Sequence, residues 1–269
     1  MLEKICVFIF GSIVGSFLNV CVHRLPLEES VVFPGSHCPK CKKLISWFDN
    51  IPFLSYILLA GKCRFCKEKI SPRYFLVELL TAAMFLLFYL RFGFNFKFFL
   101  YVIFTCGLII STFVDFAHRI IPDEISIGGM VAGFCLNALR GVAFKPFAYN
   151  YHPLVDSFLG ILVGGGVIYL TGYLFDLVYF KLLKHPPIQG ETESMGGGDV
   201  KLLAMIGAFL GWKAALITFF VAPFFGMVVG LFNMVVKKDH LIPYGPFLSL
   251  AALLAIFWQQ RILHMLFLQ

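Results

Sequence analysis

Residues 196–212 read Gly-Gly-Gly-Asp-Val-Lys-Leu-Leu-Ala-Met-Ile-Gly-Ala-Phe-Leu-Gly-Trp, a glycine-rich step that ends in an acid and leads into an apolar run. Bringing a carboxylate toward hydrocarbon is costly, so Asp199 at this place indicates a functional residue. The glycines before it permit a tight turn and the close approach of another chain. A second acid, Asp115, ends another apolar run in the same way.

The composition of the whole chain is that of a membrane protein. Of 269 residues, 59% are hydrophobic and only 14% are charged, whereas about a quarter are charged in average soluble domains. The net charge of +7 does not indicate a nucleic-acid partner, because nine of the 22 basic residues lie in the one long polar stretch, between Arg24 and Arg73. Loop charges of this kind set the orientation of membrane helices. We therefore expect an all-α polytopic membrane protein in a lipid bilayer.

Apolar runs long enough to cross a bilayer recur along the chain, since a spanning helix needs about 20 residues. Together they predict about eight transmembrane helices. The segment 5–22 is interpreted as a retained first span, because it lacks a strongly basic start and a small-residue cleavage site. The clear runs are 5–22, 74–92, 97–116, 154–180, 214–236 and 247–268, and the weaker ones are 124–141 and 200–212.

Charge predicts how these runs are oriented. We expect a first transmembrane helix at 1–22, a cytoplasmic loop domain at 23–73 and a transmembrane domain at 74–269, with the N-terminus outside. With eight spans, Asp115 then lies at the cytoplasmic end of the third and Asp199 at the cytoplasmic start of the sixth. The two acids are thus predicted to lie on the same side of the membrane, at similar depth.

Four cysteines in the polar loop have the spacing of a metal site. Cys38, Cys41, Cys63 and Cys66 form a C-x2-C-x21-C-x2-C pattern, close to that of a zinc ribbon. Four thiolates complete a tetrahedral site, so a structural zinc is expected. Disulfides are disfavoured in a reducing cytoplasm, and redox chemistry would need only one pair. The other four cysteines stand singly in apolar runs and are expected only to pack: Cys6, Cys21, Cys106 and Cys135.

Asp115 is the best-placed partner for Asp199. Pro122 favours a helix start there, so Asp123 is expected to be a cap or first-turn acid, and Asp156 falls on the opposite face. Glu124 follows the same proline, and spacing leaves two other acids possible: Glu78 and Asp176. Two neighbouring carboxyls share a proton and can act as acid and base on a peptide bond. From the residues alone, an aspartyl protease, a transporter or channel, and a scaffold all stay open.

Several motifs, taken in order, resemble the bacterial type IV prepilin peptidases, a family of Gly-x-Gly-Asp intramembrane aspartyl proteases. The resemblance covers nearly the whole chain. It rests on 15–20 with 23–26, on the two cysteine pairs, on 50–56 with 73–78, on 115–123 and on 195–202. The distance between the two acids is longer than we expect for the family, and the loops 141–153 and 181–194 are expected to hold the excess.

The resemblance implies that Asp115 and Asp199 are the catalytic aspartates of a bacterial inner-membrane enzyme serving a type IV pilus or type II secretion system. The substrate implied is a prepilin or pseudopilin, whose basic leader is cut after a Gly at the cytoplasmic face. Members with the tetracysteine loop also N-methylate the new N-terminus with S-adenosylmethionine. Candidates for that second site are Asn19, Arg24 and Glu78, which are equally well explained as residues that orient the loop.

With such a substrate, the glycines gain a second expected role. Gly196, Gly197 and Gly198 are expected to leave room for an extended substrate backbone beside Asp199. The alternative function is a zinc-containing membrane transporter or a pilus or secretion assembly scaffold, in which the same acids carry protons or make contacts.

Overall fold

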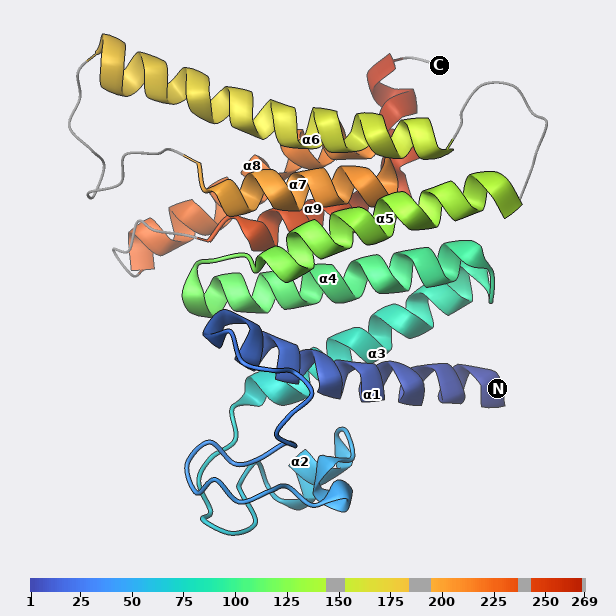
Figure 1. Ribbon diagram of the computed structural model, residues 1–269, viewed down its shortest axis with the longest axis vertical. Helices are drawn as coiled ribbons and strands as arrows, with labels where there is room; N and C mark the ends of the chain where they lie inside the picture. The colour runs from blue at the N-terminus through green and yellow to red at the C-terminus, as the bar shows by residue number, and fades with distance from the viewer. Residues whose placement is uncertain (144–152, 184–194, 237–242, 268–269) are drawn as a thin grey trace. The chain divides into compact units, whose positions relative to one another are not determined.

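The computed structural model describes residues 1–143, 153–183, 195–236 and 243–267, which fold into helices with no strand among them (Figure 1). This confirms the all-α fold class. The apolar runs became α1 (Leu2–Arg24), α3 (Pro72–Phe92), α4 (Phe96–His118), α5 (Asp123–Ala143), α6 (Pro153–Asp176), α7 (Gly197–Leu210), α8 (Trp212–Val236) and α9 (Gly245–Phe267), and the polar loop holds the short α2 (Leu54–Leu58). Most of the predicted loop 141–153 and of the loop 181–194 lies outside the described residues.

Six helices in the described ranges are long and apolar enough to cross a membrane: α1, α3, α4, α6, α8 and α9. The chain is therefore a multi-pass membrane protein, but the predicted total of eight spans is not confirmed. α7 has 14 residues and a length of about 21 Å, short of a hydrocarbon layer about 30 Å thick. α5 has 21 residues but includes acids, glycines and an asparagine.

Two packing units make up the chain, Met1–Val114 and Asp115–Gln269. The predicted division at 22 and 73 stays a prediction. In the first unit, α1 and α3 run antiparallel with their backbones in close approach. A Cβ on Gly15 would lie 2.8 Å from the Cα of Glu78, and one on Gly11 would lie 2.9 Å from the Cα of Ala82. Small residues permit such contact between membrane helices.

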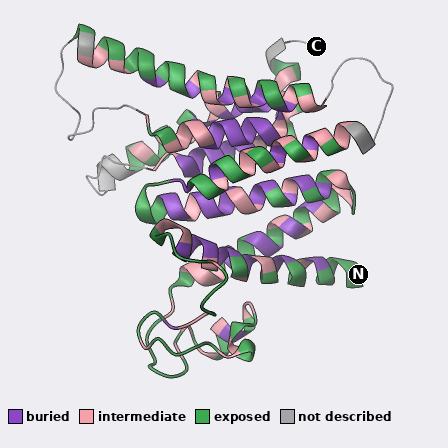
Figure 2. Cartoon of the chain, viewed as in Figure 1, coloured by how far each residue is buried: buried purple, intermediate pink, exposed green. Residues whose placement is uncertain are grey.

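α7 is the centre of the second unit. It packs against α5, α6, α8 and α9, and its residues Leu202–Phe209 are all buried, the purple stretch of Figure 2. A helix that is apolar all round is either surrounded by protein or spans a membrane, and the burial of Leu202–Phe209 shows that protein surrounds this one. The weak span predicted at 200–212 is therefore the internal helix α7.

The C-terminal part of α7 is fixed by its neighbours. Gly160 of α6 crosses Gly207 so closely that a Cβ on either would overlap the carbonyl group of the other. Near its C-terminus, Asn137 Nδ2 and Ser157 Oγ donate hydrogen bonds to the carbonyl oxygen of Ala208, at 3.0 and 2.7 Å. Because these bonds satisfy a carbonyl that a helix end leaves free, they hold α7 between α5 and α6 and so set where Asp199 lies.

Candidate functional site

Asp115 lies near the end of α4, where it is 5% exposed. Its Oδ2 accepts a hydrogen bond of 2.9 Å from the backbone N–H of Gly245, the first residue of α9. A helix N-terminus carries partial positive charge and favours a carboxylate there. A Cβ on Gly245 would lie 2.7 Å from this oxygen, so the absence of a side chain is what permits the contact.

Asp199 lies in the first turn of α7, and it interacts electrostatically with Asp115 and with Tyr244. Ile121 is packed between the helix starts. Its side chain lies 3.2 Å from the place of a Cβ on Gly198 and 3.3 Å from that of a Cβ on Gly245. The end of α4 and the starts of α7 and α9 therefore converge on the two acids.

The other acids considered from the sequence lie elsewhere. Asp123 is the first residue of α5 and forms an ion pair of 2.7 Å with Lys201, in keeping with its expected place in a first turn. Asp156 lies against Gly211, at the opposite end of α7 from Asp199. Asp176 is the last residue of α6, Glu124 lies in the exposed first turn of α5, and Glu78 belongs to the first packing unit.

The glycines of the Gly-Gly-Gly-Asp step do not form the predicted tight turn. Gly196 is an extended N-cap with φ −67°, and Gly197 and Gly198 are helical. Among the described glycines only Gly61, Gly93 and Gly211 have positive φ. Of the two converging acids, Asp115 is approached most closely by Gly245, a residue that the sequence analysis missed. Its one local signal is that Gly-Pro begins an apolar helix.

The tetracysteine loop forms a cluster that could bind a metal ion. The four Sγ atoms of Cys38, Cys41, Cys63 and Cys66 all lie within 4.8 Å of one another, and those of Cys38 and Cys66 are 3.8 Å apart. A tetrahedral ion with metal–sulfur bonds of about 2.3 Å separates its sulfurs by about 3.8 Å. All eight cysteines are described, and each is a free thiol.

The two cysteine pairs share one backbone pattern. In the first pair, Cys38 N–H donates to the Lys43 carbonyl, Lys42 N–H donates to the Cys38 carbonyl, and Lys42 has φ 57°. The second pair repeats this with Cys63, Glu68 and Lys67, the last with φ 58°. Backbone N–H groups of Cys66 and Phe65 lower the pKa of the Cys63 thiol to about 7. The thiolate, the form that binds metal, is thus favoured at Cys63, whereas burial and the neighbouring thiols raise the pKa of Cys66 to about 11.

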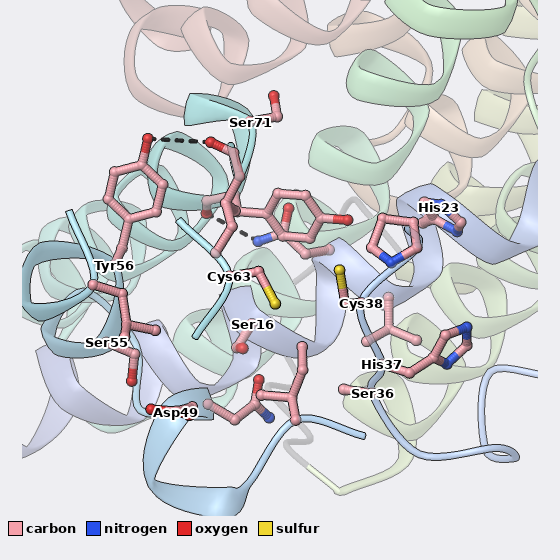
Figure 3. A pocket seen from close by; sticks show the side chains of 18 of the residues that line it. Ser16, His23, Ser36, His37, Cys38, Asp49, Ser55, Tyr56, Cys63 and Ser71 are labelled. Carbon is pink, nitrogen blue, oxygen red and sulfur yellow. Dashed lines mark hydrogen bonds between the residues drawn. The ribbon is translucent and has the colours of Figure 1, made fainter. Parts of the chain in front are cut away.

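A cavity of about 540 Å³ opens in the first unit beside this cluster, and Figure 3 shows the sulfurs of Cys38 and Cys63 at its wall. The three predicted candidates, Asn19, Arg24 and Glu78, all line it. Asn19 Nδ2 donates to the Tyr74 carbonyl at 2.9 Å, whereas its buried Oδ1 finds no hydrogen-bond partner among the described residues. Orphaned buried acceptors are rare in folded proteins.

Arg24 and Glu78 are engaged with the loop itself. Arg24 donates hydrogen bonds to the carbonyls of Ser30 and Pro34, at 2.9 and 2.7 Å. Glu78 Oε2 accepts one of 3.0 Å from the N–H of Phe53. Both charged side chains are buried, and both satisfy backbone groups.

The fold and the site define a class: a multi-pass helical membrane protein with two converging aspartates and a four-cysteine loop. Two family models match it, "Bacterial Peptidase A24 N-terminal domain" at residues 9–92 and "Type IV leader peptidase family" at residues 102–231. The chain belongs to the type IV leader peptidase family. No solved structure matches it.

Similar curated proteins are named prepilin leader peptidase/N-methyltransferase. The chain is 36% identical to that of Myxococcus xanthus over 230 residues, which cover 86% of this chain and 63% of the relative. It is 31% identical to that of Aeromonas salmonicida and 33% identical to that of Pseudomonas aeruginosa, with 95% and 96% of this chain and 91% of each relative covered. The alternative of a transporter or scaffold is not favoured by these names.

Proposed function

We propose that this protein is a membrane aspartyl endopeptidase that removes the basic leader of prepilins or pseudopilins and then N-methylates the new N-terminus. The convergence of Asp115 and Asp199 carries the first activity, and the names of the relatives support both. The basic loop 23–73 supports a cytoplasmic site in the bacterial inner membrane.

The two carboxyls perform the cleavage by sharing one proton. The ionised carboxylate takes a proton from a water molecule as the water oxygen attacks the carbonyl carbon of the peptide. The protonated carboxyl gives its proton to the carbonyl oxygen. The roles then reverse: the protonated acid gives its proton to the amine as the C–N bond breaks. Since Gly245 holds Oδ2 of Asp115, Oδ1 is the oxygen that we expect to take part.

Substitution of the acids tests this proposal. Asp115→Asn and Asp199→Asn should each abolish cleavage of a leader-bearing peptide in proteoliposomes, because an amide cannot exchange the proton. The matched control is Asp123→Asn, at the start of the neighbouring helix, which should keep most of the activity. Full processing by Asp199→Asn would contradict the assignment.

Glycine clearance beside Asp199 is a separate part of the proposal. No described atom lies within 4 Å of a Cβ placed on Gly197, whereas one on Gly198 lies 3.2 Å from Ile121. Gly197→Leu should therefore leave the helix bundle intact and raise the KM for the leader peptide, since its side chain enters the space kept for substrate. Gly198→Leu is a poorer probe, because it also disturbs Ile121. A normal KM for Gly197→Leu would rule out the clearance role.

Zinc is the metal that we propose for the cysteine cluster, because four thiolates at tetrahedral spacing suit it and leave no open position. Its role is then structural. This fits a cluster that joins two distant loop segments.

S-adenosylmethionine is the methyl donor that we propose for the cavity, which has the size of a small-molecule site. When bound, it supplies a methyl group to an amine. Asn19 Oδ1 offers an acceptor to its N–H groups, and the carboxylate of Glu78 suits its positive charge. Arg24 is expected to hold the loop rather than the ligand, since its guanidinium bonds to loop carbonyls.

A further inference from the structure

Part of the tetracysteine loop folds back along the middle of α1. The ring of Phe53 stacks on Phe8 of α1 with centroids 5.8 Å apart. A second cavity of about 330 Å³ is lined jointly by α1 and by loop residues of the 31–36 and 50–52 segments. Ser16, on its α1 wall, lies about 12 Å from Arg24 along the helix. The loop therefore lies alongside the middle of α1, well away from the Arg24 end of this membrane-spanning helix.

The folded-back segments, residues 31–34 and 51–58, expose large apolar side chains. Phe33 is 76% exposed and Leu58 is 73% exposed, and Val32 and Ile57 are also exposed. Soluble surfaces rarely carry such side chains in contiguous patches. The outer face of α1, at Ile9, Ile13 and Phe17, is about half exposed as well, as expected of a face in lipid. The loop residues extend that face.

Several backbone groups in and next to these segments are paired within the protein, which suits a non-aqueous setting because an unsatisfied group is costly in hydrocarbon. Glu78 accepts from Phe53 N–H, and Arg24 donates to the carbonyls of Ser30 and Pro34. Ser30 Oγ accepts from the N–H groups of residues 32 and 33, and Ser55 Oγ donates to the carbonyl of residue 48. Residues 34 and 52 are prolines and have no N–H to satisfy.

We propose that residues 31–34 and 51–58 are embedded in the acyl chains of the leaflet at the Arg24 end of α1. The tetracysteine loop is then a partly inserted subdomain, with Trp47, 81% exposed, at the depth where membrane proteins favour tryptophan. The lysines of the second cysteine pair lie toward the headgroups, where basic residues meet anionic lipid. Acyl chains are the occupant because the exposed surface continues the lipid face of α1. The inference does not depend on the proposed function.

Fluorescence quenching by brominated lipids measures this insertion. The full chain is made without its three tryptophans (Trp47→Phe, Trp212→Phe and Trp258→Phe). One tryptophan is then returned at a time and compared in bilayers with and without bromine in the acyl chains. Leu58→Trp and Phe33→Trp are the test variants. The references are Ile13→Trp, on the lipid face of α1, and Lys62→Trp, on the polar part of the loop.

We expect the fluorescence loss at positions 58 and 33 to match that at position 13 and to exceed that at position 62. Bound metal, measured in each variant, checks that the loop is folded, and Ile57→Trp replaces a variant that loses it. Losses no greater than at position 62 would overturn the proposal. So would protection of position 58 from aqueous iodide only when leader peptide is added, because the surface would then bind substrate instead of lipid.

Discussion

The N–H of Gly245 donates a hydrogen bond to Oδ2 of Asp115, and Gly245 has no Cβ that would push the carboxylate away. The two residues are 130 positions apart in the sequence, so no local pattern pairs them. Asp115 and Asp199 could be found from the sequence because a carboxylate at the end of an apolar run is conspicuous. Gly245 could not, since a glycine before a proline at a helix start has many ordinary explanations.

Gly245→Ala tests this contact by adding one methyl group. The added Cβ displaces Asp115, and a hydrogen bond to a charged group is lost, worth about 1.5–3 kcal/mol. Cleavage should fall by about 10- to 100-fold, a factor of ten for each 1.4 kcal/mol, while the protein stays folded in the membrane. The matched control is Gly166→Ala on α6, where a Cβ meets no described atom and which should cleave normally. Equal rates for the two variants would remove Gly245 from the site.

At the scale of elements, the apolar runs predicted the helices closely because hydrocarbon requires long uninterrupted segments. The run 97–116, for example, became α4 at Phe96–His118. The prediction was less successful for α7, because hydropathy cannot separate a helix surrounded by protein from one surrounded by lipid. For the loop domain 23–73 the sequence predicted the cysteine cluster but not the contacts with α1 and α3, since bonds such as Glu78 to Phe53 join residues far apart.

Removal of the metal tests whether the ion holds the tetracysteine loop in its fold. The two cysteine pairs come from separate loop segments, so without the ion the four thiols have little to hold them together. A strong chelator, or Cys41→Ser, should expose the loop to limited proteolysis between the two pairs. Cys135→Ser, a single cysteine on the exposed surface of α5, is the control and should keep both the metal and the resistance. A loop that stays resistant without metal would show that packing alone folds it.

For the whole molecule, the two proposed sites lie in different packing units. Met1–Val114 contains the cysteine cluster and the cavity, and Asp115–Gln269 contains both acids. The two family models divide the chain between residues 92 and 102, near the same place. Composition alone could predict the membrane class, but the division needed the packing, because the break falls inside the continuous helix α4.

The two activities should therefore be separable. Asn19→Leu should abolish binding of labelled S-adenosylmethionine, measured by equilibrium dialysis, and leave leader cleavage near normal, because Asn19 lies in the unit without the acids. Asp199→Asn should do the reverse. If Asn19→Leu binds the donor as the unaltered protein does, the cavity is not its site, whatever happens to cleavage.

The glycine crossing of α6 and α7 also fixes the level of Asp199 along α6. Gly160 meets Gly207 and Gly164 meets Leu203, so Asp199 is level with the middle of α6, near Ile168. The span that includes α6 continues to Phe180, about 18 Å further at 1.5 Å per residue. In the proposed cleavage, both the peptide and the attacking water then have to reach Asp199 at this level of the helix bundle.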